Sequence, residues 1–248
     1  MPGAASRTHG GPDAHGRARW DFSTNGNAAG PCPTALVALR GADAAHYPDP
    51  GYRALRERLA AWHGVAPERI VVAASASEFI QRLTAVGARL APGPVAVPAH
   101  AYGDYAAAAR AWGRTVTGET DPAATLRWSC EPSSPLGQDA PPPPGVALDA
   151  PGVAVLDAVY APLRLEGASA WDEAVRGRVF ELYSPNKALG LTGVRGAYAI
   201  APAAVDGPVA AWPLAEKSQR ARPCASGPPC VRDAAPGVTM PASPTTRW

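Results

Sequence analysis

One lysine lies in a loop whose composition suits a reactive amine. The segment SPNKALGLTGVRG, residues 184–196, surrounds Lys187 with proline, leucines and small residues and places Arg195 eight positions later. Burial and a neighbouring cation both lower the pKa of a lysine, and an amine must lose its proton before it attacks an aldehyde. A solvated loop lysine accounts for the same letters equally well, because glycine-rich loops with one lysine are common.

A carboxylate and a tyrosine follow a second apolar segment. VAVLD ends on Asp157, and Tyr160 comes three positions later. A carboxylate at such a strand end can pair with a pyridinium nitrogen and keep it protonated, which makes a heteroaromatic cofactor an electron sink. Tyr160 could donate to the phenolate oxygen of that cofactor. Each residue alone has a simpler interpretation, a helix cap or loop ion pair for Asp157 and a half-buried ring for Tyr160.

Two further groups have the chemistry to hold a phosphorylated ring. Ser75, Ala76 and Ser77 lie between an apolar run and an amphipathic segment, where the amides of a helix N-terminus can bind phosphate. Plain N-capping by serine is the alternative. Tyr102, in PAHAYGDY, offers a flat ring for stacking on a cofactor or for the core. None of these groups decides the chemistry alone.

Apolar runs that alternate with amphipathic segments position these residues. Short continuous apolar runs predict strands at residues 70–74, 94–98, 125–130, 153–157 and 178–184. Apolar residues at helical spacing predict two helices, one with Tyr52, Leu55, Leu59 and Trp62 and one with Phe79, Ile80, Leu83 and Val86, and a third is alanine-rich from Tyr105 to Trp112. This alternation predicts an α/β fold with a parallel or mixed sheet, in which ligands bind beyond the carboxyl ends of the strands.

The composition favours a small substrate. The 23 basic and 21 acidic residues are spread along the chain and leave a net charge of +2, so no patch for nucleic acid or for an anionic membrane is expected. No apolar run approaches the roughly 18 residues of a membrane helix. The four scattered cysteines fit a reducing compartment, and the predicted location is the cytoplasm.

The order of these segments resembles a known family. From Asp21 to about Pro202 the sequence resembles the class I/II aminotransferases, pyridoxal-phosphate enzymes of fold type I. The nearest branch is that of histidinol-phosphate aminotransferase and threonine-phosphate (cobyric acid) decarboxylase. The resemblance implies a three-layer large domain with a mainly parallel mixed sheet and pyridoxal 5'-phosphate as cofactor. It makes Lys187 the Schiff-base lysine of an internal aldimine, Asp157 the partner of the pyridine nitrogen and Tyr160 the donor to the ring oxygen.

Other positions of the family pattern surround the ring and its phosphate. The resemblance implies that Tyr102 stacks on the ring. It also implies that Arg195 and the residues Ala76, Ser77 and Ser184 hold the phosphate. Tyr47, in HYPDPGY, matches a tyrosine that reaches the phosphate of a neighbouring subunit. That match predicts a homodimer.

The sequence departs from the family pattern at two points near the cofactor. The family segment NPNNPTG stands here as EPSSPLG, residues 131–137, which puts Ser134 where an asparagine usually bonds the ring oxygen. Serine is shorter and has one donor, so a weaker or water-mediated contact is expected. Asn186 replaces the serine that commonly precedes the lysine.

A larger departure follows GAYAIAP. Family members continue into a small α/β domain that binds the substrate carboxylate, whereas residues 206–248 are rich in Pro, Arg, Ser and Ala without periodicity. We expect that small domain to be largely missing, through truncation or a frameshift after about Ala211, and the tail to be irregular. Arg220, Arg222 and Arg232 are candidate replacement ligands for the carboxylate. The predicted units are an N-terminal arm and loop (1–46), the cofactor-binding large domain (47–205) and this tail.

Three functions stay open at this stage. The first is an aminotransferase for an amino acid, phosphorylated or not, in which Lys187 is general base at Cα. The second is threonine-phosphate decarboxylase of cobalamin biosynthesis, which THGGP and DFSTNGN favour, with His9 and Asn27 as substrate ligands. The third is a cofactor-binding remnant without turnover.

Overall fold

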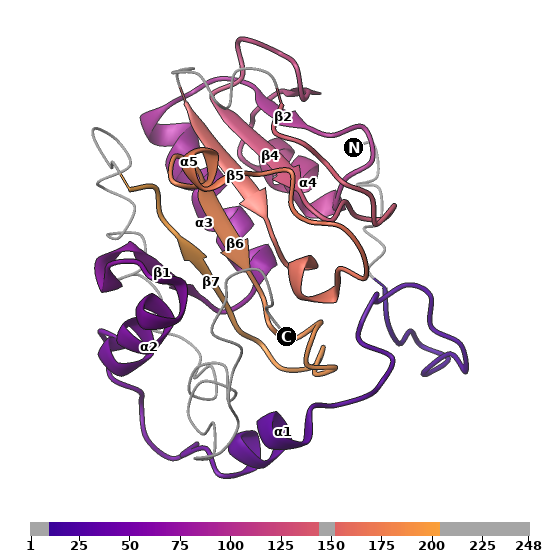
Figure 1. The fold of residues 1–248 in the computed structure, drawn as a ribbon. Helices are drawn as coiled ribbons and strands as arrows, with labels where there is room; N and C mark the ends of the chain where they lie inside the picture. The colour runs from indigo at the N-terminus through magenta and orange to yellow at the C-terminus, as the bar shows by residue number, and fades with distance from the viewer. Residues whose placement is uncertain (1–9, 144–151, 204–248) are drawn as a thin grey trace.

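A seven-stranded sheet forms the centre of the protein (Figure 1). The structure, a computed structural model, describes residues 10–143 and 152–203. The strands are β1 Ile70–Ala73, β2 Val95–Val97, β3 Val116–Gly118, β4 Leu126–Cys130, β5 Val153–Asp157, β6 Phe180–Tyr183 and β7 Ala197–Ile200. The helices are α1 Pro33–Arg40, α2 Arg53–His63, α3 Ala76–Leu90, α4 Gly103–Ala111 and α5 Glu173–Arg176, with 3₁₀ turns at Pro67–Arg69 and Ala161–Leu163.

The strand order is β1-β7-β6-β5-β4-β2-β3. Strand β7 pairs antiparallel with both β1 and β6, and all other pairs are parallel. The strands other than β7 therefore end at the same edge. Their carboxyl ends are level in the middle of the sheet, because Asp157 is in register with Cys130 of β4 and with Leu182 of β6. The predicted mainly parallel mixed sheet is confirmed.

Helices cover both faces of the sheet and make three layers (Figure 1). One core lies under α3 and α4, where Phe79, Ile80 and Tyr105 pack on alternate strand residues such as Val71 and Val155. The intervening strand residues face the other way. A second core joins α2 to β1 and β7, and a third joins Trp171 and the α5 region to β5. The period of two along each strand decides which face a side chain enters.

The predicted elements are present with small shifts, and the helices α1 and α5 and the strands β3 and β7 were not predicted. Helix α4 begins at Gly103, two residues before the predicted start. Strand β3 has three residues at the sheet edge and β7 has four, which is too short for a clear apolar run. Helix α1 lies inside the segment predicted as arm and loop, and Pro33 at its first position is a helix-start signal.

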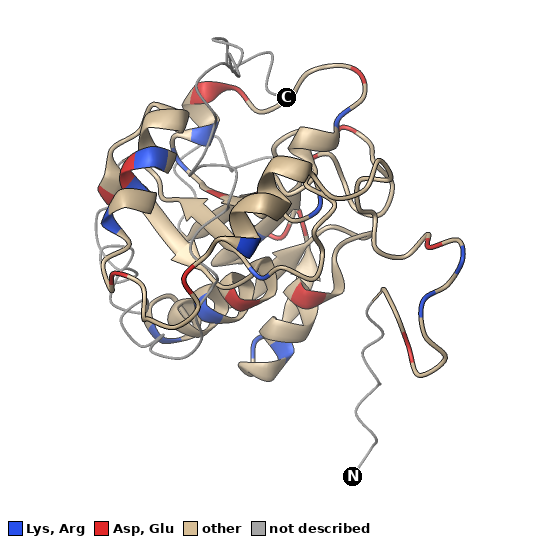
Figure 2. Ribbon diagram, turned by 90° about the horizontal axis from the view of Figure 1, so that it is seen from below, with Lys and Arg blue, Asp and Glu red and all other residues tan. Residues whose placement is uncertain are grey.

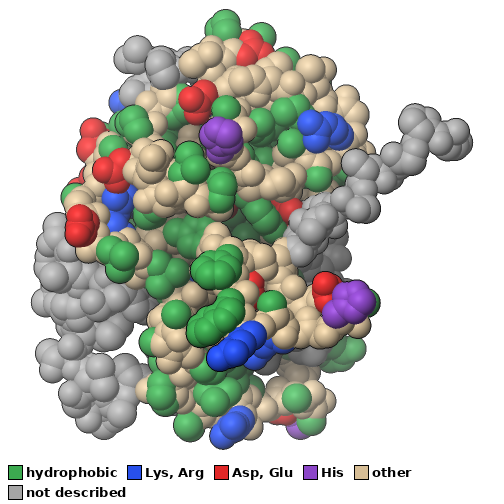
Figure 3. All heavy atoms as spheres, turned by 90° about the vertical axis from the view of Figure 1, so that its right-hand side faces the viewer, with side chains coloured by type: hydrophobic (Ala, Val, Ile, Leu, Met, Phe, Trp, Pro, Cys, Tyr) green, Lys and Arg blue, Asp and Glu red, His purple; other side chains and the backbone are tan. Residues whose placement is uncertain are grey.

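Charged residues of both signs are interspersed along the described helices and loops (Figure 2). Large apolar side chains of the N-terminal segment are exposed, with Trp20 71% and Phe22 90% accessible. Hydrophobic side chains are also visible among polar ones on the face toward which that segment projects (Figure 3). Within residues 10–143 and 152–203, none of the helices has both the length and the apolar character needed to cross a bilayer.

Candidate active site

The carboxyl edge of the sheet carries most of the side chains predicted to act. Each of them follows one of the strands that end at this edge. Ser77 follows β1, Tyr102 follows β2, Ser134 follows β4, Tyr160 follows Asp157 at the end of β5, and Ser184 and Lys187 follow β6. Loops at the carboxyl edge of such a sheet are where ligands bind.

Asp157 is a buried carboxylate, 4% exposed. It lies two residues after Val155 on β5 and therefore faces the α3 and α4 layer. The Tyr105 hydroxyl donates to its Oδ2 at 2.6 Å, and the Val159 amide donates to its Oδ1 at 3.1 Å. Burial raises the pKa of Asp157 to about 6, although both hydrogen bonds oppose the rise. The group is thus ionised at neutral pH and able to stabilise a cation at the sheet edge.

Tyr160 lies beside Asp157 and contacts two loops. Its hydroxyl interacts with the side chains of Ser134 and Asn25, and burial raises its pKa. The tyrosine therefore remains a hydrogen-bond donor over the physiological range. Ser134 of the EPSSPLG segment thus lies beside Tyr160, and its contact with the ring oxygen stays a prediction. Asn25 was not predicted near this site.

The first turn of α3 lies next to Tyr102. The Ser75 side chain caps α3 by accepting a hydrogen bond from the Glu78 amide at 3.1 Å. Phosphate binding at this helix terminus stays a prediction. The hydroxyls of Ser77 and Tyr102 are 3.1 Å apart. The Tyr102 ring meets Tyr105 edge-on, with centroids 5.8 Å apart. These contacts connect the predicted phosphate position to the carboxylate at the end of β5.

The Lys187 amine is half-buried and donates to the carbonyl oxygen of Thr24. Burial lowers the pKa of Lys187, and the charge of the nearby Arg195 lowers it further. Asp21 opposes this change, and the Asp21 carboxyl itself has a pKa lowered to about 2 by hydrogen bonds from Ser23 and Thr24. The direction of this shift is the one expected from the composition of the loop, and the role of Lys187 as a reactive amine stays a prediction.

The N-terminal segment is docked on the Lys187 loop. The Asn27 backbone amide donates to the Lys187 carbonyl at 2.9 Å, and its side-chain Nδ2 donates to the Ala188 carbonyl at 2.9 Å. Cys32 N donates to Leu189 O at 2.8 Å. Asn27, predicted as a substrate ligand, therefore holds the lysine loop in this structure, and its role toward a substrate stays a prediction.

Some predicted residues lie apart from these contacts. Ser184 is buried, and its hydroxyl lies 2.7 Å from Asn186 Oδ1 and 3.0 Å from the Gly196 carbonyl, so it binds its own loop. Arg195 is exposed. Tyr47 is 90% exposed in the loop between α1 and α2. His9, Arg220, Arg222 and Arg232 lie outside the described residues.

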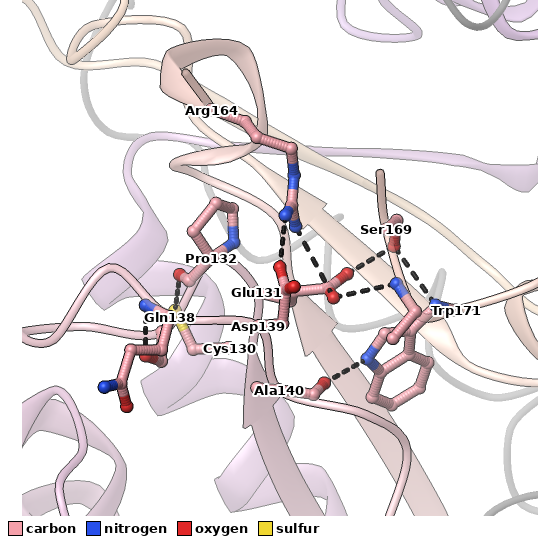
Figure 4. A network of polar contacts seen from close by, with 11 residues as sticks. Cys130, Glu131, Pro132, Gln138, Asp139, Ala140, Arg164, Ser169 and Trp171 are labelled. Carbon is pink, nitrogen blue, oxygen red and sulfur yellow. Dashed lines mark hydrogen bonds and ion pairs between the residues drawn. The ribbon is translucent and has the colours of Figure 1, made fainter. Parts of the chain in front are cut away.

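A buried acid that sequence analysis did not single out for a role anchors the Ser134 loop (Figure 4). Glu131 is 2% exposed and directly follows β4. Its carboxylate forms an ion pair with Arg164 at 3.4 Å and accepts hydrogen bonds from the Ser169 hydroxyl and, at 2.9 Å, from the Ala170 amide. Arg164 also pairs with Asp139. The glutamate at the position of the family asparagine was a visible signal, but its partner Arg164 is 33 residues away in the chain and could not be predicted from it.

Comparison with known sequences gives short matches to two curated relatives. No protein-family model matches the chain. The sequence is 40% identical over 65 residues to a histidinol-phosphate aminotransferase 2 of Burkholderia mallei. That match covers 24% of this chain and 18% of the relative.

Solved structures match over most of the described chain. Histidinol-phosphate aminotransferase from Sinorhizobium meliloti, in complex with pyridoxal-5'-phosphate, superposes with a TM-score of 0.63 and 21% identity, over 84% of this chain and 60% of that one. L-threonine-O-3-phosphate decarboxylase from Porphyromonas gingivalis gives 0.61 and 23%, over 79% and 66%. The chain thus spans about three fifths of the length of the first structure. These similarities confirm the predicted fold and the resemblance to this group of proteins.

Proposed function

We propose that this chain, which has the fold of the aminotransferases, is a pyridoxal-phosphate-dependent aminotransferase that acts on an amino acid. The observation that carries the proposal is that two groups with shifted pKa values, Lys187 and Asp157, both lie at the carboxyl edge of one sheet. Burial lowers the pKa of the Lys187 amine and raises the pKa of the Asp157 carboxyl to about 6. Shifted pKa values, here raised for an acid and lowered for a base, are typical of catalytic sites.

The residues present fit this cofactor. An amine of lowered pKa can bond to an aldehyde, and a buried carboxylate can pair with a ring nitrogen. The first turn of the 15-residue helix α3, with Ala76 and Ser77, offers amides and a hydroxyl to a phosphate. The exposed Arg195 supplies a cation near Lys187.

Each residue has a separate task in the proposed reaction. Pyridoxal phosphate, when bound, supplies an electron sink for the bonds at Cα of an amino acid. Lys187 would remove the Cα proton as general base and deliver it to the former aldehyde carbon of the cofactor, so that the amino group stays with the cofactor and a keto acid leaves. Asp157 stabilises positive charge on the ring nitrogen, and Tyr160 and Ser134 donate hydrogen bonds to the ring oxygen. Tyr102 supplies a flat ring for stacking.

Spectroscopy tests the cofactor assignment directly. Purified protein mixed with pyridoxal phosphate should gain a visible absorbance band that the Lys187→Ala variant lacks. Borohydride reduction followed by peptide mass spectrometry should place a phosphopyridoxyl group on Lys187. Modification spread over several surface lysines, with no specific band, would refute the assignment.

A decarboxylase is the second candidate, because the chain also superposes on a threonine-phosphate decarboxylase. Incubation with threonine phosphate, and separately with histidinol phosphate plus 2-oxoglutarate, distinguishes the two. Carbon dioxide release supports the decarboxylase, and glutamate formation supports the aminotransferase. A cofactor band that responds to neither substrate supports a binding protein without turnover.

We also propose that the chain acts as a homodimer. The Tyr47 side chain is exposed and is therefore accessible to a second copy of the chain. Sedimentation velocity measures the oligomeric state, and Tyr47→Phe should weaken cofactor binding only if the Tyr47 hydroxyl reaches the partner's phosphate. A monomer over micromolar to millimolar concentration would contradict this part of the proposal.

A further inference from the structure

Tyr105 joins α4 to the carboxylate at the end of β5. It lies in the first turn of α4, is 0% exposed, and donates its hydroxyl hydrogen to Asp157 Oδ2 at 2.6 Å. Charge-assisted bonds of this length are among the stronger hydrogen bonds in proteins. The resemblance assigned no role to this tyrosine, which was expected only to begin a helix.

Two aromatic neighbours restrict the Tyr105 ring. It stacks on Trp128 of β4 with centroids 4.7 Å apart and an interplanar angle of 7°. Tyr102 meets it edge-on at 86°. Because the ring is packed between a strand residue and a site residue, its hydroxyl is fixed at the carboxylate. The fixed hydroxyl in turn limits rotation of the Asp157 side chain.

We propose that Tyr105 is a positioning residue that keeps the Asp157 carboxylate ionised and oriented for a protonated ring nitrogen. The inference rests on the proposed cofactor function and deepens it. Oδ2 is committed to Tyr105 and Oδ1 to the Val159 amide, so both oxygens are held in place and each keeps a further lone pair for a ligand.

The surroundings of Asp157 explain why it needs this donor. Burial raises the pKa of Asp157 to about 6, and the Tyr105 hydrogen bond is the largest influence in the opposite direction. The other titratable groups near it do not supply positive charge. Cys130 and Tyr160 have raised pKa values and remain neutral, and the Glu131 carboxylate is directed to Arg164. Loss of the tyrosine hydroxyl should therefore move the pKa of Asp157 into the neutral range.

The decisive experiment titrates Asp157 in the full chain without added cofactor. Carboxyl carbon NMR of aspartate-labelled protein, with Asp157→Asn for assignment, gives the pKa in wild type and in Tyr105→Phe. We expect Tyr105→Phe to raise that pKa by about one unit or more, a tenfold change in ionisation. Tyr183→Phe is the matched control, because the Tyr183 hydroxyl donates to another carboxylate, Glu181, at 2.7 Å.

A second substitution tests the opposite sign and protects against misfolding. Incorporation of 3-fluorotyrosine at position 105 keeps the ring and makes the hydroxyl a stronger donor, so the pKa of Asp157 should fall. An unchanged pKa of Asp157 in both variants would overturn the inference even if wild type binds pyridoxal phosphate. Failure of wild type to bind the cofactor would instead defeat the proposed function, and the inference with it.

With cofactor present, the pH profile of the absorbance provides an independent readout. In Tyr105→Phe the cofactor's affinity should fall at least several-fold at pH values between the wild-type pKa of Asp157, about 6, and the raised pKa of the variant, because only wild-type Asp157 is ionised there. Above the raised pKa the two affinities should converge, and Tyr183→Phe should leave affinity unchanged at every pH. A uniform loss of affinity at every pH in Tyr105→Phe would indicate a packing role only and would contradict the inference.

Discussion

Removal of Arg164 should destabilise the protein strongly, because it leaves the Glu131 carboxylate buried without its cation. The Glu131 side chain is 1% exposed and that of Arg164 15%, with 3.4 Å between them. Breaking a buried ion pair from one side costs about 3–5 kcal/mol. Ser169 and the Ala170 amide still donate to Glu131, so for Arg164→Ala we expect a loss near the lower end, about 3 kcal/mol.

Urea unfolding by linear extrapolation measures this loss as a fall in the free energy of unfolding. Glu131→Gln, which keeps the shape but removes the charge, should recover part of the loss in the double variant Glu131→Gln/Arg164→Ala, with a coupling energy of about 1 kcal/mol or more. Arg110→Ala, at an exposed position in the last turn of α4, is the matched control and should change stability by about 0.5 kcal/mol or less. Equal small effects of Arg164→Ala and Arg110→Ala would refute the reasoning about the buried pair.

Three other substitutions test separate parts of the structure. Since the folded pKa of Asp157 is raised from 3.8 to about 6, the folded state binds the extra proton, and stability is lost as pH rises through that window. This loss amounts to about 3 kcal/mol between pH 3 and pH 7 and should be absent in Asp157→Asn when the free energy of unfolding is measured with urea at each pH. The same pH dependence in wild type and variant would contradict the burial argument. Gly190→Ala should cost about 2 kcal/mol or more, because φ is +63° and a Cβ would lie 2.3 Å from the Gly30 carbonyl oxygen, whereas the open Gly193→Ala should not. Ser75→Ala should lower the stability by about 1 kcal/mol through loss of the α3 cap, and a thermal melt unchanged from wild type would show that the cap is dispensable.

The sheet could be predicted because several of its strands are mainly apolar runs. IVVA and LRWSC are buried along their whole length and VAVLD over its last three residues, and such strands need no alternation in the sequence. Short edge elements carry weaker signals, so β3 was missed. The strand β7 was missed because AYAI lies among glycines and has four residues. Local chemistry also predicted the α3 start, since Ser75 precedes an amphipathic stretch.

The contacts of the site depend on pairs that are distant in the chain. Lys187 and Asp157 were identified from their neighbours in sequence, but the Thr24 carbonyl that receives the lysine amine is 163 residues away. Tyr105 is 52 residues from Asp157. A lone tyrosine at a helix start is compatible with many environments, so its partner becomes evident only when α4 is packed on the sheet. Burial of Glu131 likewise depends on Arg164.

The docking of residues 24–32 on the loop of residues 187–190 has a consequence for the order of synthesis and folding. The two segments meet through bonds that span 157 to 163 residues, among them Cys32 N to Leu189 O and Lys187 Nζ to Thr24 O. Contacts of such sequence separation form late, because a long loop must close first. During translation the N-terminal segment, in which Trp20 and Phe22 are exposed, cannot dock before the loop of residues 187–190 has left the ribosome. We therefore expect the contact between the Lys187 amine and the N-terminal segment to be among the last to form during folding.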